Sequence, residues 1–143
     1  RGSGWGLAAD FRSLPRINRM ARPEFSSTVV VRPLAEHTDP AKQRWAYAYT
    51  LTIVNTGDVP AQLIAREWLI TDLDGHVQHV RGLGVVGHQP MLQPGERFEY
   101  TSWAQLDTPQ GSMTGKFIGI TENADWFESP VPEFMLADMA ALH

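Results

Sequence analysis

The chain has 143 residues, no cysteine and a formal net charge of −4. This length fits a single domain, and the lack of cysteine excludes disulfides, thiolate metal sites and a cysteine nucleophile. No apolar run approaches the roughly 18 residues that a membrane-spanning helix needs, so we expect no membrane partner. A cysteine-free chain suits the reducing cytosol, and we expect a cytoplasmic protein.

The charge is distributed unevenly along the chain. Residues 1–22 contain five arginines and one aspartate, a net charge of +4, which leaves −8 on the remainder. A body of that charge repels phosphates, so we expect no nucleic-acid partner. Five scattered arginines are more typical of a solvated tail than of a binding site for an anionic surface.

The first 24 residues have no sustained periodicity and are expected to form a disordered or non-native tail. They contain several glycines, and Pro15 and Pro23 interrupt them. They also lack the apolar core of a secretory signal. We expect the natural chain to begin at Met20, with residues 1–19 as an upstream extension that adds nothing to stability. The predicted domain spans residues 25–138, and residues 139–143 form a short C-terminal tail.

The remainder of the chain has the sequence pattern of a β protein. In the stretch 45–53, aromatic and large apolar residues alternate with alanine and threonine, which predicts a strand with its apolar face toward a core. Asp74-Gly75 marks a tight hairpin. No amphipathic segment is long enough for a helix. The predicted strands are 26–34, 45–53, 61–72, 76–81, 96–106, 112–121 and 126–136.

Two strands have distinctive positions in the expected sheets. The strand 61–72 is apolar on both sides, which suits the centre of a sheet, whereas Pro130 and Pro132 place the last strand at an edge or a bulge. Seven short antiparallel strands predict an all-β, immunoglobulin-like or fibronectin type III-like β-sandwich, with Trp68 buried between the sheets. Alternation assigns one face of the strand 61–72 to Ile64, Arg66, Trp68 and Ile70, and the other to Leu63, Ala65, Glu67 and Leu69.

Several motifs, in order and without gaps over about residues 26–137, resemble the ApaG family of bacterial proteins. The same domain occurs in some eukaryotic F-box proteins and in a DNA-polymerase-interacting protein. One turn departs from the family pattern, since residues 123–126 lack the expected glycine. The motifs are YAYTLTIVNTG (47–57), QLIAREWLI (62–70), VRGLGVVG (80–87), QP (89–90), PG (94–95), FEYTS (98–102), TPQGSM (108–113) and PEF (132–134).

The resemblance implies a fibronectin type III-like sandwich without supplying an established reaction. It implies links to cobalt and magnesium efflux or tolerance, that is, divalent cation homeostasis. It also implies a link to diadenosine tetraphosphate metabolism. The eukaryotic members imply a role in protein–protein recognition.

A glycine-rich segment is the first candidate site. Gly82, Gly84 and Gly87 match the G-x-G-x-x-G pattern of dinucleotide-binding folds, but Pro90 prevents the helix that this pattern requires. The segment could still hold an anion through its backbone amides, with Arg81 and His88 as side-chain partners. We favour the alternative that these glycines serve positive φ angles and close packing.

Metal and catalytic sites are not expected. The histidines at 76, 79 and 88 lie near Asp72 and Asp74, but His76 and His79 face opposite sides of a regular strand, and the hairpin explains both aspartates. Neither Ser102 nor Ser112 lies in a nucleophile elbow.

Arg66 and Trp103 form a candidate interaction surface. Trp103 faces away from the apolar side of its strand, and exposed arginine and tryptophan are typical interface anchors. For Arg66 we favour structural pairing with a carboxylate such as Glu67 or Glu99 over a role as a surface anchor.

Together these patterns predict a non-catalytic binding module without a cofactor, whose partner is an unidentified protein. The alternative is a sensor of small anions or nucleotides, such as polyphosphates or pyrophosphate, bound weakly at Gly82–Gly87.

Overall fold

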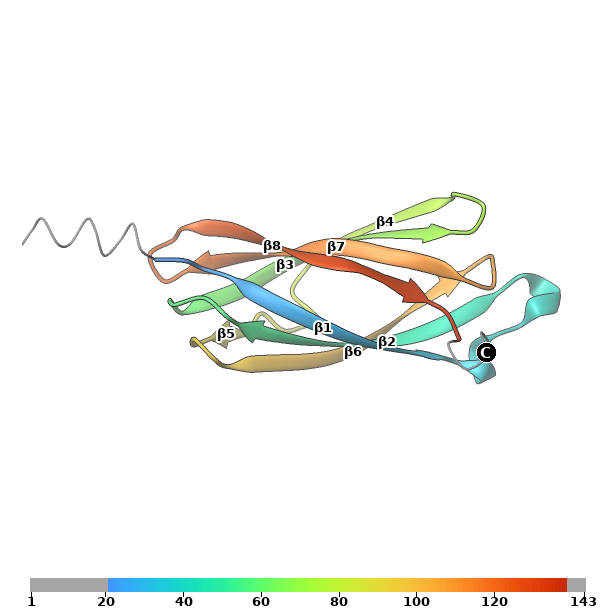
Figure 1. Ribbon diagram of the computed structural model, residues 1–143, viewed down its shortest axis with the longest axis horizontal. Coiled ribbons are helices and arrows are strands. Elements are labelled where there is room, and N and C mark those ends of the chain that lie inside the picture. The colour runs from blue at the N-terminus through green and yellow to red at the C-terminus, as the bar shows by residue number, and fades with distance from the viewer. Residues whose placement is uncertain (1–20, 139–143) are drawn as a thin grey trace, which may run out of the picture.

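The structure is a computed structural model that describes residues 21–138, and it consists of two antiparallel β-sheets packed face to face (Figure 1). The fold class predicted from the sequence is therefore confirmed. The strands are β1 (Phe25–Pro33), β2 (Trp45–Asn55), β3 (Ala61–Asp72), β4 (Val77–Leu83), β5 (Met91–Leu92), β6 (Arg97–Leu106), β7 (Gly111–Thr121) and β8 (Trp126–Leu136).

The smaller sheet has the strand order β1-β2-β6, and the larger has the order β4-β3-β7-β8. As expected, β3 lies inside its sheet. The predicted edge position of β8 is also confirmed, because within residues 21–138 it pairs with β7 alone. The register between β7 and β8 shifts between Met113 and Gly115, opposite the proline-containing part of β8.

The core lies between the two sheets. The alternation on β2 is confirmed, since Tyr47, Tyr49, Leu51 and Ile53 are buried. Trp68 is 1% exposed, as predicted, and its ring packs edge-on against Phe117 at a centroid distance of 5.6 Å.

The face assignment of β3 is wrong at its beginning. A β-bulge between Leu63 and Ala65 inserts Ile64 as an extra residue, so Leu63 faces the core together with Trp68 and is fully buried. A bulge shifts the alternation by one residue. Ala65 and Glu67 remain on the outer face, as predicted.

The segment predicted as one loop between β4 and β6 contains a further strand. Met91 and Leu92 pair with Gln62 and Ala61, so β3 has two partners along the same side. Two short 3₁₀ turns, Ala35–His37 and Pro40–Lys42, precede β2. No helix within residues 21–138 is long and apolar enough to cross a membrane. The expectations for residues 1–20 and 139–143 lie outside the described residues. Residues 22–24, which the sequence assigns to the tail, bond to the turn after β2, where the N–H groups of Thr56 and Gly57 donate to the Glu24 carbonyl at 3.0 and 3.1 Å.

The turn at residues 123–126, where the resemblance leads us to expect a glycine, contains a residue in the left-handed conformation that glycine favours. Ala124 adopts a φ of 66°, and its N–H donates to the Thr121 carbonyl at 2.9 Å. Thr121 Oγ1 accepts from the N–H of Asp125 at 3.1 Å. The side chain of Thr121 thus supports a left-handed residue that would otherwise favour glycine.

Candidate functional site

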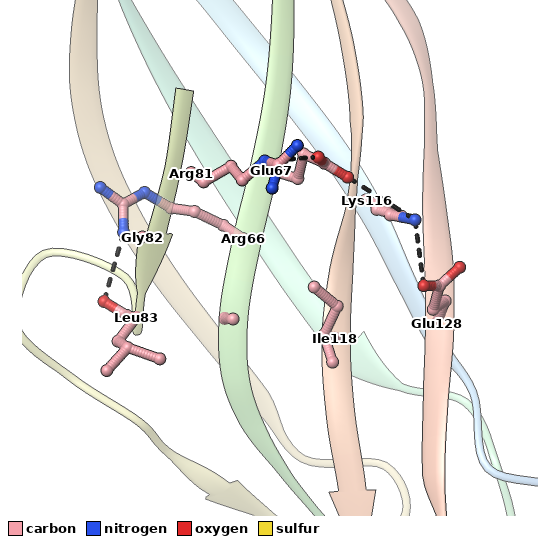
Figure 2. Close-up of a pocket in the computed structure, with 9 residues that line it drawn as sticks. Arg66, Glu67, Arg81, Gly82, Leu83, Lys116, Ile118 and Glu128 are labelled. Atoms are coloured by element: carbon pink, nitrogen blue, oxygen red, sulfur yellow. Dashed lines mark hydrogen bonds and ion pairs between the residues drawn. The ribbon is translucent and has the colours of Figure 1, made fainter. Parts of the chain in front are cut away.

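The outer face of the larger sheet carries a hollow of about 450 Å³ (Figure 2). Its apolar lining comes from Ala65 on β3, Leu83 on β4 and Ile118 on β7. The register explains the depression, because Ala65 is paired with both Leu83 and Ile118 and its small side chain lies between two larger ones. Leu83 is 75% exposed, so the hollow presents accessible apolar surface.

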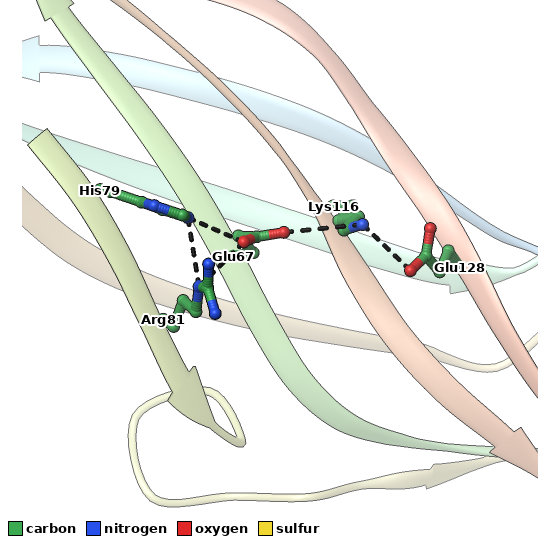
Figure 3. Close-up of polar contacts among 5 residues, drawn as sticks. All are labelled: Glu67, His79, Arg81, Lys116 and Glu128. Carbon is green, nitrogen blue, oxygen red and sulfur yellow. Dashed lines mark hydrogen bonds and ion pairs between the residues drawn. The ribbon is translucent and has the colours of Figure 1, made fainter. Parts of the chain in front are cut away.

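A row of charged side chains borders the hollow across β4, β3, β7 and β8 (Figure 3). Glu67 Oε2 accepts from His79 Nε2 at 2.7 Å and lies 3.0 Å from Arg81 Nε. Lys116 Nζ lies 3.6 Å from Glu67 Oε1 and 3.0 Å from Glu128 Oε2. Within this row the two carboxylates balance Arg81 and Lys116, and Arg66, which also lines the hollow, adds one positive charge.

The pKa values of this row follow its pairing. The hydrogen bond from His79 holds the pKa of Glu67 below its usual range, with Arg81 and Lys116 acting in the same direction. The hydrogen bond to Glu128 raises the pKa of Lys116. Both groups are therefore charged at neutral pH and held in place, which is the behaviour of a structural rim rather than of a proton-transfer pair.

The glycine-rich segment forms a tight hairpin in which the amides of Gly84, Val85 and His88 are bonded to carbonyls. The N–H of Gly84 donates to the Ile64 carbonyl at 2.6 Å, and Val85 and His88 exchange N–H···O bonds of 2.8 and 3.0 Å. Gly84 and Gly87 have φ angles of 69° and 82°, and Val86 between them has a φ of 49°. Val85 is fully buried and anchors the hairpin in the core. The amides of Gly84, Val85 and His88 are therefore already bonded and not available to an anion.

Gly82 serves a different need from the other two glycines. It lies in β4 opposite Arg66, and a Cβ at this position would meet Arg66 Nη1 at 2.6 Å. The expectation of positive φ holds for Gly84 and Gly87, and the structure gives Gly82 no such angle. Close packing against a guanidinium is therefore what Gly82 provides.

The favoured pairing of Arg66 with a carboxylate is wrong. Arg66 Nη1 donates to the Leu83 carbonyl at 3.3 Å (Figure 2) and to the Gly84 carbonyl at 2.9 Å. Glu67 instead pairs with the cations described above, and Glu99 accepts from Thr52. Adjacent residues of a strand point to opposite faces, which separates Arg66 from Glu67. Arg66 thus ties the glycine-rich hairpin to β3.

A family model described as the ApaG domain matches residues 35–120. The chain belongs to the ApaG family. A protein ApaG from Ralstonia nicotianae is 53% identical over 124 residues, covering 87% of this chain and 100% of that protein. A protein ApaG from Dechloromonas aromatica is 53% identical over 110 residues, or 77% of this chain and 87% of that protein. The ApaG match includes the hollow except for Glu128.

A crystal structure of a putative ApaA protein from Bordetella pertussis has the same architecture. It is 50% identical in sequence, superposes with a TM-score of 0.78, and covers 81% of this chain and 94% of that chain. The sandwich described above is therefore also the fold of a solved relative.

On the opposite sheet of this ApaG domain, Trp103 lies on the outer face of β6 and is 60% exposed, which agrees with its predicted orientation. Its ring stacks on His37 at a centroid distance of 6.5 Å. Trp103 and Arg66 do not form one surface, because Trp103 belongs to the smaller sheet and Arg66 to the larger. The joint interaction surface predicted from them is not assembled.

The Asp72, Asp74 and His76 side chains bring ligand atoms within 4.8 Å of one another. Asp72 Oδ1 already accepts the N–H groups of Asp74 and His76 at 2.8 and 3.0 Å, which closes the β3–β4 hairpin. Burial acts to raise the pKa of Asp72, but these bonds outweigh it and the pKa lies below its usual value. His79 and His88 lie elsewhere, with Glu67 and Phe98 respectively.

Proposed function

We propose that this ApaG domain is a non-catalytic protein-binding module that docks its partner on the outer face of the larger sheet. The observation that carries the proposal is the hollow lined by Ala65, Leu83 and Ile118 and bordered by paired charges. Concave apolar surface with a few fixed polar groups is the usual form of a binding site. The partner presents an apolar anchor that fills the hollow.

The ion-paired side chains that border the hollow predict how the partner is recognised. Three basic side chains, Arg66, Arg81 and Lys116, and two acidic ones, Glu67 and Glu128, line the site. Both carboxylates pair with Arg81 or Lys116, and Arg66 bonds to backbone carbonyls. Recognition then depends on shape and apolar burial, and long-range attraction contributes little. A module that acts through a protein partner needs no metal or nucleotide of its own. Such a module is also compatible with the expected links to cation efflux and diadenosine tetraphosphate metabolism.

The partner is to be captured from bacterial lysate on the immobilised chain, identified by mass spectrometry and purified for titration. Ala65→Glu, which fills the hollow with a charge, is expected to weaken its binding at least about tenfold, or 1.4 kcal/mol. The control Val30→Glu changes a residue that is 70% exposed on the other sheet and should leave binding unchanged. Equal loss of binding in both variants, or no loss in either, would contradict the proposed site.

Raising the salt concentration from about 0.05 to 0.5 M should change the dissociation constant of the complex less than about threefold.

The nucleotide-sensor alternative gives a different result in calorimetry. We expect ATP and diadenosine tetraphosphate, with or without magnesium, to bind no tighter than about 1 mM, or about −4 kcal/mol. The amides of Gly84, Val85 and His88 are occupied, and the chain beyond residue 22 carries a charge of −8. Micromolar binding that disappears in Arg81→Ala without loss of stability would favour the sensor instead.

A further inference from the structure

The strand β4 leaves one of its two edges open within residues 21–138, since β3 is its one pairing partner there. The direction of its backbone groups follows from the neighbouring bonds. Gly84 N–H donates to the Ile64 carbonyl and Asp72 N–H to the His76 carbonyl. Bonding alternates along an antiparallel ladder, so residues 78, 80 and 82 bond to β3, whereas residues 77, 79, 81 and 83 direct their N–H and C=O groups outward. Of these outward groups, the Leu83 carbonyl already accepts from Arg66 Nη1 at 3.3 Å, which leaves its second lone pair for a further donor.

Other edges of the described sandwich are better protected. The strand β8 contains Pro130 and Pro132, which cannot donate to a further strand. Its neighbour across the sandwich is β1, where the Phe25 N–H donates to Ser129 Oγ at 3.0 Å. On β6, the Gln105 carbonyl accepts from Gln78 Nε2 at 3.0 Å. Proteins commonly block edges with proline or with charge, and β4 has no proline.

The positive charge on β4 does not block its edge, because it is compensated. Arg81 and His79 both contact Glu67 Oε2, at 3.0 and 2.7 Å. The two ends of the strand are apolar and accessible, since Val77 is 56% and Leu83 is 75% exposed. An incoming strand would therefore meet apolar side chains at both ends and neutralised polar ones in the middle.

We propose that two copies of this chain associate by antiparallel pairing of their β4 edges about a two-fold axis at Val80. In this register, Val77 of each copy lies opposite Leu83 of the other, and His79 lies opposite Arg81. Gln78 lies opposite Gly82, where the Arg66 guanidinium takes the space of the missing side chain and offers N–H donors to the Gln78 amide oxygen. A register centred on Arg81 would place two arginines face to face, which is unfavourable.

The pairing joins the two larger sheets into one, so that their two hollows lie on a common surface. Seven residues in each strand bury less area than a standard stable interface, so the dimer is expected to be weak, with a dissociation constant roughly in the micromolar to millimolar range. The dimer does not require the partner proposed above, although Arg81 and Leu83 belong to both contacts.

Disulfide cross-linking tests the register. The chain contains no cysteine, so an introduced cysteine is the only thiol that can react. At the two-fold axis the Cα atoms of a non-hydrogen-bonded pair lie about 4.5 Å apart, which a disulfide can bridge. Mild oxidation of the full chain carrying Val80→Cys should give a covalent dimer. In Gln78→Cys the two sulfurs belong to residues about 13 Å apart along the strands, and no dimer should form. Equally fast cross-linking of Gln78→Cys, or of Thr101→Cys on β6, would overturn the proposal.

Charge rescue tests the same contact without a covalent bond. Val77→Glu alone and Leu83→Lys alone should each weaken self-association in sedimentation velocity at least about tenfold. Their combination in one chain should restore it, because the two positions face each other across the axis. Unchanged melting temperatures show that the variants are folded. A wild-type chain that stays monomeric up to about 1 mM, or a double variant that associates no better than the single ones, would refute the pairing.

Discussion

Replacing Trp68 with alanine is expected to lower the free energy of unfolding by about 3–5 kcal/mol, the usual cost of truncating a buried aromatic side chain. Trp68 is 1% exposed and lies at the centre of a group of rings. Its centroid is 5.6 Å from that of Phe117 and 6.2 Å from those of Tyr49 and Phe134. These neighbours come from three other strands in both sheets, so the cavity cannot close by moving one of them.

The measurement is chemical denaturation with linear extrapolation, which also reports whether the slope changes. Trp103→Ala is the matched control, because Trp103 is 60% exposed and its loss should cost within about 0.5 kcal/mol. A cost below about 1 kcal/mol for Trp68→Ala would contradict the central position of this side chain.

The sandwich was accessible from sequence because its strongest signals are local. The alternation on β2 directly predicts the buried face formed by Tyr47 to Ile53, and the prolines of β8 predict its edge position. The bulge at Ile64 was not predictable in this way. Leu63, Ile64 and Ala65 are all apolar, so a shift of one residue leaves no visible break in the pattern.

The hollow illustrates what local patterns omit. Ala65, Leu83 and Ile118 meet because three strands adopt one particular register, and nothing near any of the three residues indicates the others. The charged row has the same origin, since Glu67, His79 and Lys116 belong to three different strands. Opposite charges were visible in the sequence, but their pairing depends on cross-strand neighbours.

Arg66 shows a second limit. A carboxylate was the natural partner to expect for a half-buried arginine, but the carbonyls of Leu83 and Gly84 take that place. Backbone acceptors are present at every residue and leave no trace in the sequence. The contact does explain, in retrospect, why a glycine stands at position 82 in the middle of a strand.

In the glycine-rich hairpin, alanine is expected to be more harmful at Gly84 than at Gly87. Both residues have positive φ, which costs an alanine about 1–2 kcal/mol. At Gly84 a Cβ would also lie 2.6 Å from the His88 carbonyl oxygen, whose position is fixed by its bond to Val85. At Gly87 a Cβ would meet nothing within 4 Å. Gly84→Ala should therefore cost more than about 2 kcal/mol, and Gly87→Ala about 1–2 kcal/mol.

Val86 provides the opposite test in the same hairpin. It is a β-branched residue with a φ of 49°, a conformation that asparagine tolerates far better. Its side chain is 58% exposed, so little packing is lost on replacement. Val86→Asn should raise the free energy of unfolding by about 0.5–1 kcal/mol in urea denaturation. Equal costs at Gly84 and Gly87, together with no gain from Val86→Asn, would mean that the hairpin adopts another conformation in solution. A larger cost for Gly84→Ala than for Gly87→Ala would instead show that backbone geometry and packing explain these glycines, without a bound anion.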